Sequence, residues 1–76
     1  MAKKYVIEEI RKERNMSQRE LAEKLGINRS LLSHIETGKV LPTFDKLLEI
    51  ARILNCLITD LYNEEDLEVI EKSSNK

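Results

Sequence analysis

Six hydrogen-bonding side chains lie close together near the middle of this 76-residue chain, and none of them is a carboxylate. They are Asn28, Arg29, Ser30, Ser33, His34 and Thr37. On a helix, the positions from Arg29 to Thr37 fall at i, i+1, i+4, i+5 and i+8, which is one face. Such a face can exchange hydrogen bonds with base edges, and it is free of the negative charge that phosphate would repel. The plain alternative is a solvated polar face, which every surface helix has.

The net charge hides an uneven distribution along the chain. The total of 13 Lys and Arg against 14 Asp and Glu gives −1, which on average argues against a nucleic-acid binder. Residues 1–59 hold 11 basic and 8 acidic side chains, a balance of +3, whereas residues 60–76 hold 2 and 6, a balance of −4. We therefore expect a mildly basic domain over residues 1–63 and an acidic extension over 64–76, partly helical or frayed.

The composition limits the class of protein. With 41% hydrophobic and 36% charged residues, 2 Gly and 1 Pro, the chain suits one small helical domain. The lone Cys56 cannot form an internal disulfide, so we expect it to be a small core side chain in a cytoplasmic protein. We expect neither a signal peptide nor a membrane span, because no apolar run is long enough.

Helical spacing of apolar residues runs through almost the whole chain and predicts an all-α fold. A first helix is expected over residues 4–14, with Asn15 at its end. Ser17-Gln18-Arg19-Glu20 is a capping box, which starts a second helix at Gln18 that stops at Gly26. Asn28 can cap a third helix, from Arg29 to Thr37, with Gly38 as its stop.

A fourth helix should begin after the cap Thr43 and end at Asn55. We expect a short fifth helix near the end of the domain, and rim packing for Tyr5 and Tyr62. The side chains expected to reach the core from the fourth helix are Phe44, Leu47, Leu48, Ala51 and Leu54, and those that suggest the fifth helix are Ile58, Leu61 and Tyr62.

Only Gly26-Ile27-Asn28 separates the second helix from the third. Helices joined so tightly cross steeply, and the small Ala22 on the second lets the third pack close. The pair is therefore predicted to be a helix-turn-helix.

The run Ser-Gln-Arg-Glu-Leu-Ala-Glu-Lys-Leu-Gly, followed by Ile-Glu-Thr-Gly-Lys and a proline, carries a resemblance that extends from Ile10 to Tyr62. This segment is similar to the helix-turn-helix family of Cro and the lambdoid phage repressors, also called the xenobiotic response element family. The resemblance implies a compact five-helix repressor-like domain that inserts its third helix into the major groove. It also implies a homodimeric transcriptional regulator, most often a repressor, on a pseudo-palindromic operator of double-stranded DNA.

Matching the family motif residue by residue gives the expected site. Arg29 and Ser30 fall on the leading base-contacting positions and His34 on the one a turn later, and Ser33 shares their face. Backbone contacts are expected from Gln18, Asn28, Thr37 and Lys39. Arg11 and Glu36 match a charge pair that joins the first and third helices.

The chain departs from the family pattern at three positions. Asn15 and Asn55 stand where glycine is usual, which a left-handed turn tolerates. Leu57 stands where a Ser or Thr cap usually opens the fifth helix, and an exposed apolar residue there suggests a subunit contact. The expected dimer surface consists of Leu57, Ile58, Leu61 and Leu67.

Other functions have less support in the sequence. No catalytic constellation, metal-ligand cluster or cofactor loop is present, so we expect no enzyme, no metal, no cofactor and no small-molecule effector. Two alternatives stay open. One is an antitoxin, or a controller of a mobile element or restriction system, with a protein partner; the other is a protein-interaction module that uses its acidic end.

Overall fold

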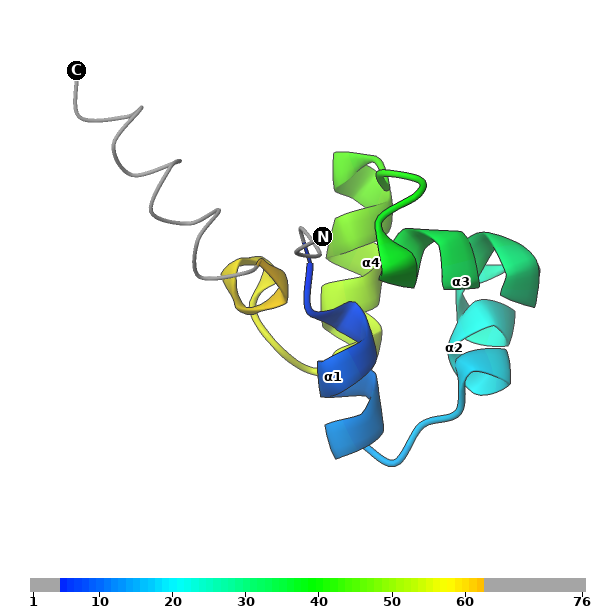
Figure 1. Ribbon diagram of the computed structural model, residues 1–76. Coiled ribbons are helices and arrows are strands. Elements are labelled where there is room, and N and C mark those ends of the chain that lie inside the picture. The colour runs from blue at the N-terminus through cyan, green and yellow to red at the C-terminus, as the bar shows by residue number, and fades with distance from the viewer. Residues whose placement is uncertain (1–4, 63–76) are drawn as a thin grey trace, which may run out of the picture.

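The structure, a computed structural model, describes residues 5–62. These residues form four α-helices and a closing 3-10 helix. The helices are α1 (Ile7–Glu13), α2 (Gln18–Leu25), α3 (Arg29–Thr37) and α4 (Phe44–Leu54), and the 3-10 helix spans Ile58–Leu61. In Figure 1, α2 and α3 stand on one side of α4 and the 3-10 helix on the other. The fold is thus all-α, with a single 3-10 turn in place of the expected fifth helix.

Side-chain caps fix where α2, α3 and α4 begin. The Ser17 hydroxyl accepts from the Glu20 amide at 3.0 Å, and the Glu20 carboxylate accepts from the Ser17 amide at 3.4 Å. Asn28 Oδ1 accepts from the Leu31 amide at 2.7 Å, and the Thr43 hydroxyl from the Lys46 amide at 3.2 Å. Each bond satisfies an amide that has no partner inside its own helix. The three predicted starts are confirmed.

Left-handed residues end the helices where the sequence predicted. Gly26 and Gly38 follow α2 and α3 with φ of 70° and 87°, and Asn55 follows α4 with φ of 54°. Asn15, in the turn after α1, has φ of 55°. Asparagine therefore fills two turns where the family pattern favours glycine, because its short polar side chain tolerates this conformation better than most.

The first helix begins later than the sequence suggested. The prediction placed its start at residue 4, whereas the helix begins at Ile7. Tyr5 instead forms an isolated antiparallel bridge with Tyr62, and their rings lie 5.2 Å apart between centroids at 50°. Tyr5 is only 8% exposed and belongs to the core, whereas Tyr62 is partly buried and packs against its edge, as expected. This pairing of distant residues outweighs the local helical pattern.

The core lies between α4 and the other helices. Its fully buried large side chains come from every helix and from the 3-10 turn: Ile7, Leu21, Leu32, Ile50, Leu54 and Leu61. Two side chains expected in it lie outside, since Phe44 is 62% exposed and Leu48 36% exposed. Ile50, which the prediction passed over, takes their place. The buried stripe of α4 is therefore rotated by part of a turn from the expected one.

Candidate nucleic-acid interface

α3 has a buried side and a polar side. Leu32, Ile35 and Glu36 are buried, whereas Arg29, Ser30 and other polar residues reach the surface. The exposed set contains Arg29, Ser30, His34 and Thr37, with Ser33 half-buried beside them. The polar face predicted from residue spacing therefore exists on the folded domain.

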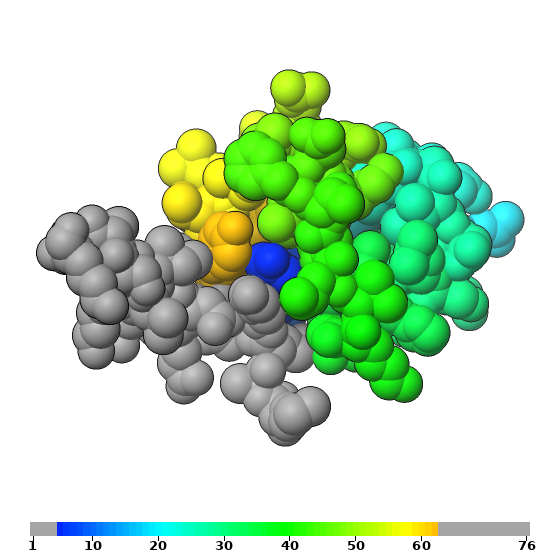
Figure 2. Space-filling view, turned by 90° about the horizontal axis from the view of Figure 1, so that it is seen from above, coloured from blue at the N-terminus to red at the C-terminus, as the bar shows by residue number. Residues whose placement is uncertain are grey.

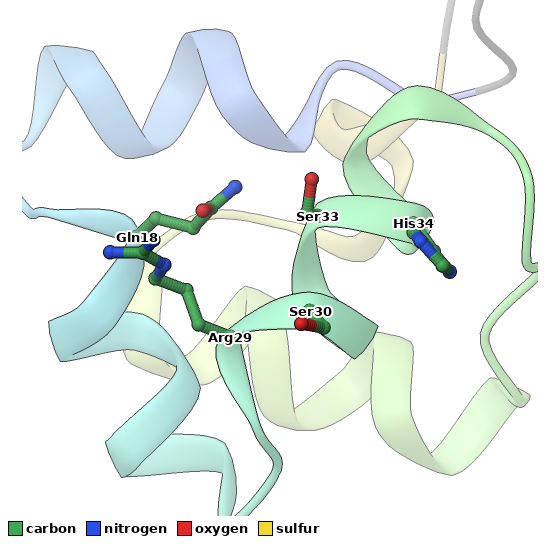
Figure 3. Close-up of a pocket in the computed structure, with 5 residues that line it drawn as sticks. All are labelled: Gln18, Arg29, Ser30, Ser33 and His34. Carbon is green, nitrogen blue, oxygen red and sulfur yellow. The ribbon is translucent and has the colours of Figure 1, made fainter.

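A hollow of about 200 Å³ opens along this face. It is lined by one residue of α2 and four of α3, namely Gln18, Arg29, Ser30, Ser33 and His34 (Figure 3). Gln18 and Arg29 lie at one end of the close-up and His34 at the other. The fold thus gathers all four expected base-contacting residues with one expected phosphate-contacting residue, because the short α2–α3 turn sets the start of α2 beside α3.

Glu36 is the acidic residue of α3, and it points away from the polar face. Its side chain is 2% exposed and accepts from Arg11 Nε at 2.7 Å and from Arg11 Nη2 at 3.2 Å. The expected pair between α1 and α3 is therefore a bidentate salt bridge, the geometry in which arginine binds a carboxylate best. Because Glu36 is buried and paired, the exposed side of α3 carries no negative side chain.

The same carboxylate also holds Gln18. Gln18 Nε2 donates to Glu36 Oε1 at 2.9 Å, and Arg11 Nη1 donates to the Met16 carbonyl at 2.9 Å. Arg11 and Glu36 together therefore tie α1, the loop before α2, the start of α2 and α3. Sequence reasoning treated Gln18 and the ion pair as separate features. The signal for their contact was chemical, since a buried carboxylate needs donors for both oxygens.

Phosphate oxygens only accept hydrogen bonds, so a residue expected to contact the DNA backbone needs a donor hydrogen that is not already engaged within the protein. Asn28 Oδ1 caps α3, and neither Asn28 Nδ2 nor the exposed Lys39 side chain has a partner among residues 5–62. Gln18 Nε2 uses one of its two hydrogens in the bond to Glu36, and the other can be donated to a phosphate. Thr37 is different, because its hydroxyl donates to the Ser33 carbonyl at 3.0 Å. Three of the four side chains, Gln18, Asn28 and Lys39, can thus donate to a phosphate as they stand. Thr37 could do so only after breaking its bond to the Ser33 carbonyl.

The side chains expected to face bases have no internal partners among the described residues. Within the described part of the chain, Arg29, Ser30 and the His34 ring make no side-chain hydrogen bond or ion pair. All five guanidinium hydrogens of Arg29 are therefore available, and an arginine fork matches the two acceptors of guanine in the major groove.

The residues expected at a dimer surface differ in their exposure to solvent. Leu57 is 69% exposed and Ile58 is half-buried, whereas Leu61 is fully buried in this chain's own core. Leu61 is therefore not available to a partner, and that part of the expectation was wrong. Leu67 lies outside the described residues.

Cys56 lies at the edge of the core rather than inside it. Partial burial raises the pKa of its thiol, the nearby Asp60 raises it further, and Arg14 acts in the opposite direction. Among residues 5–62, no three His, Cys, Asp or Glu side chains gather where they could hold a metal ion. None of the described helices has the length and apolar character to cross a membrane.

Two short helices joined by a tight turn, with an uncommitted polar face on the second, define a helix-turn-helix DNA-binding protein. Residues 7–61 match the helix-turn-helix family. The chain belongs to this family, of the Cro/C1 type, whose members are DNA-binding transcriptional regulators and not enzymes.

Known proteins agree with this assignment. An uncharacterized HTH-type transcriptional regulator of Archaeoglobus fulgidus is 36% identical over 66 residues, which cover 87% of this chain and 93% of the relative. The ImmF control region 10 kDa protein of Bacillus phage phi105 is 36% identical over 67 residues, covering 88% and 73%. The fold also resembles that of SinR, a master regulator for biofilm formation, in a crystal structure with DNA. The TM-score is 0.64 at 35% sequence identity, over 70% of this chain and 86% of that one.

Proposed function

We propose that this regulator is a repressor that binds a pseudo-palindromic operator as a homodimer and reads it with α3 in the major groove. The observation that carries the proposal is the exposed face of α3, where Arg29, Ser30 and His34 have no side-chain partner among residues 5–62 and no carboxylate of the helix is exposed. Because the regulator would act on DNA, a cytoplasmic location is part of the proposal.

Sequence discrimination is assigned to the first two turns of α3. Arg29 reads a guanine through its fork, and Ser30, Ser33 and His34 contact neighbouring base edges. The fold supports this role because Asn28 caps the helix just before Arg29, and the side chains of Asn28, Arg29 and Ser30 are all exposed.

Orientation on the duplex is assigned to donors around that helix. Gln18 and Asn28 each sit at a helix start, where free backbone amides and the helix dipole also favour phosphate. Lys39 adds an exposed positive charge just beyond Gly38. Thr37 is the weakest of the expected backbone contacts, since its hydroxyl is already engaged.

The homodimer would present two copies of α3 to major grooves about one helical turn apart, roughly 34 Å. Leu57 and Ile58 remain from the expected dimer surface, together with Leu67, and Leu57 is the one that is largely exposed.

A selection on random duplexes, followed by salt titrations of variants, tests the proposal. Arg29→Ala should relax discrimination at one base position by about 1–3 kcal/mol. Lys39→Ala should weaken binding to every sequence alike and lower the salt slope by about 1. Lys12→Ala removes the same charge from α1, outside the hollow, and serves as the control. A selected pool without an enriched half-site would refute the operator.

A second candidate is a controller of a mobile element that also binds a protein partner, as an antitoxin does. The phage control-region relative favours it, because it shares 36% identity over most of both chains. A neighbouring gene whose product changes operator binding would support this candidate, and a solitary gene would count against it.

A further inference from the structure

The outer side of α4 carries an apolar surface that the proposed DNA contacts leave unused. Four of the five exposed large hydrophobic side chains among residues 5–62 lie between positions 40 and 48: Val40 and Leu41 in the loop before α4, and Phe44 and Leu48 on α4 itself. Figure 2 shows this green segment at the surface of the domain. A cluster of exposed apolar side chains on a small domain marks a surface that binds another molecule.

Two charges accompany the apolar side chains along α4. Asp45, Leu48 and Arg52 are exposed and fall at i, i+3 and i+7, so they share one face of the helix. Phe44 lies one turn before Leu48. Asp45 lies in the first turn of α4 and Arg52 in the last. The acidic charge therefore marks one end of this face and the basic charge the other.

Neither charged side chain is paired within the described part of the chain. Asp45 and Arg52 make no hydrogen bond or ion pair there through their side chains, although the neighbouring Lys46 pairs with Glu49 at 3.5 Å. Opposite charges at the two ends of one apolar face make that face complementary to itself when it is turned end to end.

We propose that the outer face of α4 binds the same face of a second copy of this chain, with the two helices antiparallel across a two-fold axis. Asp45 of each copy then faces Arg52 of the other, twice, Leu48 is buried between the two pairs, and each Phe44 lies just beyond an Asp45 at the edge of the contact. A two-fold contact requires this reciprocity. A parallel alignment would instead set like charges together. The inference rests on the proposed homodimer and names its surface.

The antiparallel alignment also accounts for the fifth exposed apolar side chain. Leu57 follows two residues after the cap of α4, and the start of the partner's α4, with its exposed apolar residues, approaches that end of the helix. The face thus extends the surface suggested by Leu57 and does not compete with it.

Charge reversal tests the reciprocal pairing directly. In Asp45→Arg, arginine would face arginine at both ends, and in Arg52→Asp, carboxylate would face carboxylate. We expect each variant alone to dissociate at least about tenfold more readily than the parent chain in sedimentation equilibrium. An equimolar mixture of the two variants restores both opposite-charge pairs and should regain the parent affinity, as should the double variant.

Glu13→Arg is the matched control, since it makes the same charge change at an exposed position of α1 and should leave association unchanged. Three results would overturn the proposal: a parent chain that stays monomeric, single variants that associate as the parent does, or a mixture that associates no better than its components. Helix content from circular dichroism shows that each variant is folded.

DNA binding separates this inference from the proposed function. Asp45→Arg leaves the face of α3 intact, so it should bind a duplex with one selected half-site as the parent chain does, and the full palindrome more weakly. Equal loss on both duplexes would overturn the assignment of α4 to dimerisation. If the parent chain selects no half-site, the operator proposal fails, and the sedimentation results still decide the α4 contact.

Discussion

Replacing Glu36 by alanine should destabilise the domain more than any surface substitution. The change leaves the Arg11 guanidinium, whose side chain is 8% exposed, without the carboxylate that accepts two of its hydrogen bonds. Breaking a buried ion pair in this way costs about 3–5 kcal/mol. A chain of this length has a total stability of roughly 4–11 kcal/mol, so the variant loses a large part of it.

Thermal unfolding followed by circular dichroism measures the loss. At about 4–8 °C for each kcal/mol in a domain of this size, the melting temperature should fall by at least about 12 °C. Glu13→Ala removes an exposed carboxylate from α1 and should shift it little.

The double variant Arg11→Met with Glu36→Leu distinguishes an unpaired charge from lost packing. With both charges gone, most of the stability should return, because apolar residues often replace a buried ion pair without loss. Recovery should fall short by about 1 kcal/mol, since the Met16 carbonyl loses its donor. A fall of less than about 4 °C for Glu36→Ala, or a double variant no more stable than that single one, would refute the reasoning.

Three further outcomes follow from local geometry. Ser17→Ala should lower stability by about 1 kcal/mol in urea unfolding because α2 loses its capping box, and an unchanged midpoint would contradict the cap. Asn55→Ala should cost about 1 kcal/mol and Asn55→Gly nothing, because only a left-handed residue fits there; equal stability of the two variants would argue otherwise. Iodoacetamide should modify Cys56 more slowly at pH 8 in the folded chain than in urea, because burial and Asp60 hold its pKa above the ordinary value; equal rates would count against that environment.

The helix boundaries set by local chemistry were predictable from the sequence. Ser17, Asn28 and Thr43 each bond an amide within the next three residues, and Gly26 and Gly38 adopt the left-handed conformation that a glycine after a helix suggests. These signals involve neighbours in the chain and do not depend on the rest of the fold.

Features that depend on distant residues were not predictable. The bridge between Tyr5 and Tyr62 shortens α1, and no local pattern records it. The rotation of α4 exposes Phe44 and buries Ile50, because the positions of α1, α2 and the 3-10 helix decide which side of α4 is covered. The candidate site shows the same division: the face of α3 follows from residue spacing, whereas the contact of Gln18 with Glu36 requires the packed domain.

The Tyr5–Tyr62 bridge brings the two ends of the described domain together, with ring centroids 5.2 Å apart. A domain whose ends are adjacent can be inserted into a surface loop of another protein without being stretched, and it can be circularly permuted through a short linker. The polar face of α3 plays no part in that junction. The domain is therefore suited to insertion into other proteins, because new segments joined at the tyrosine pair leave the polar face of α3 unchanged.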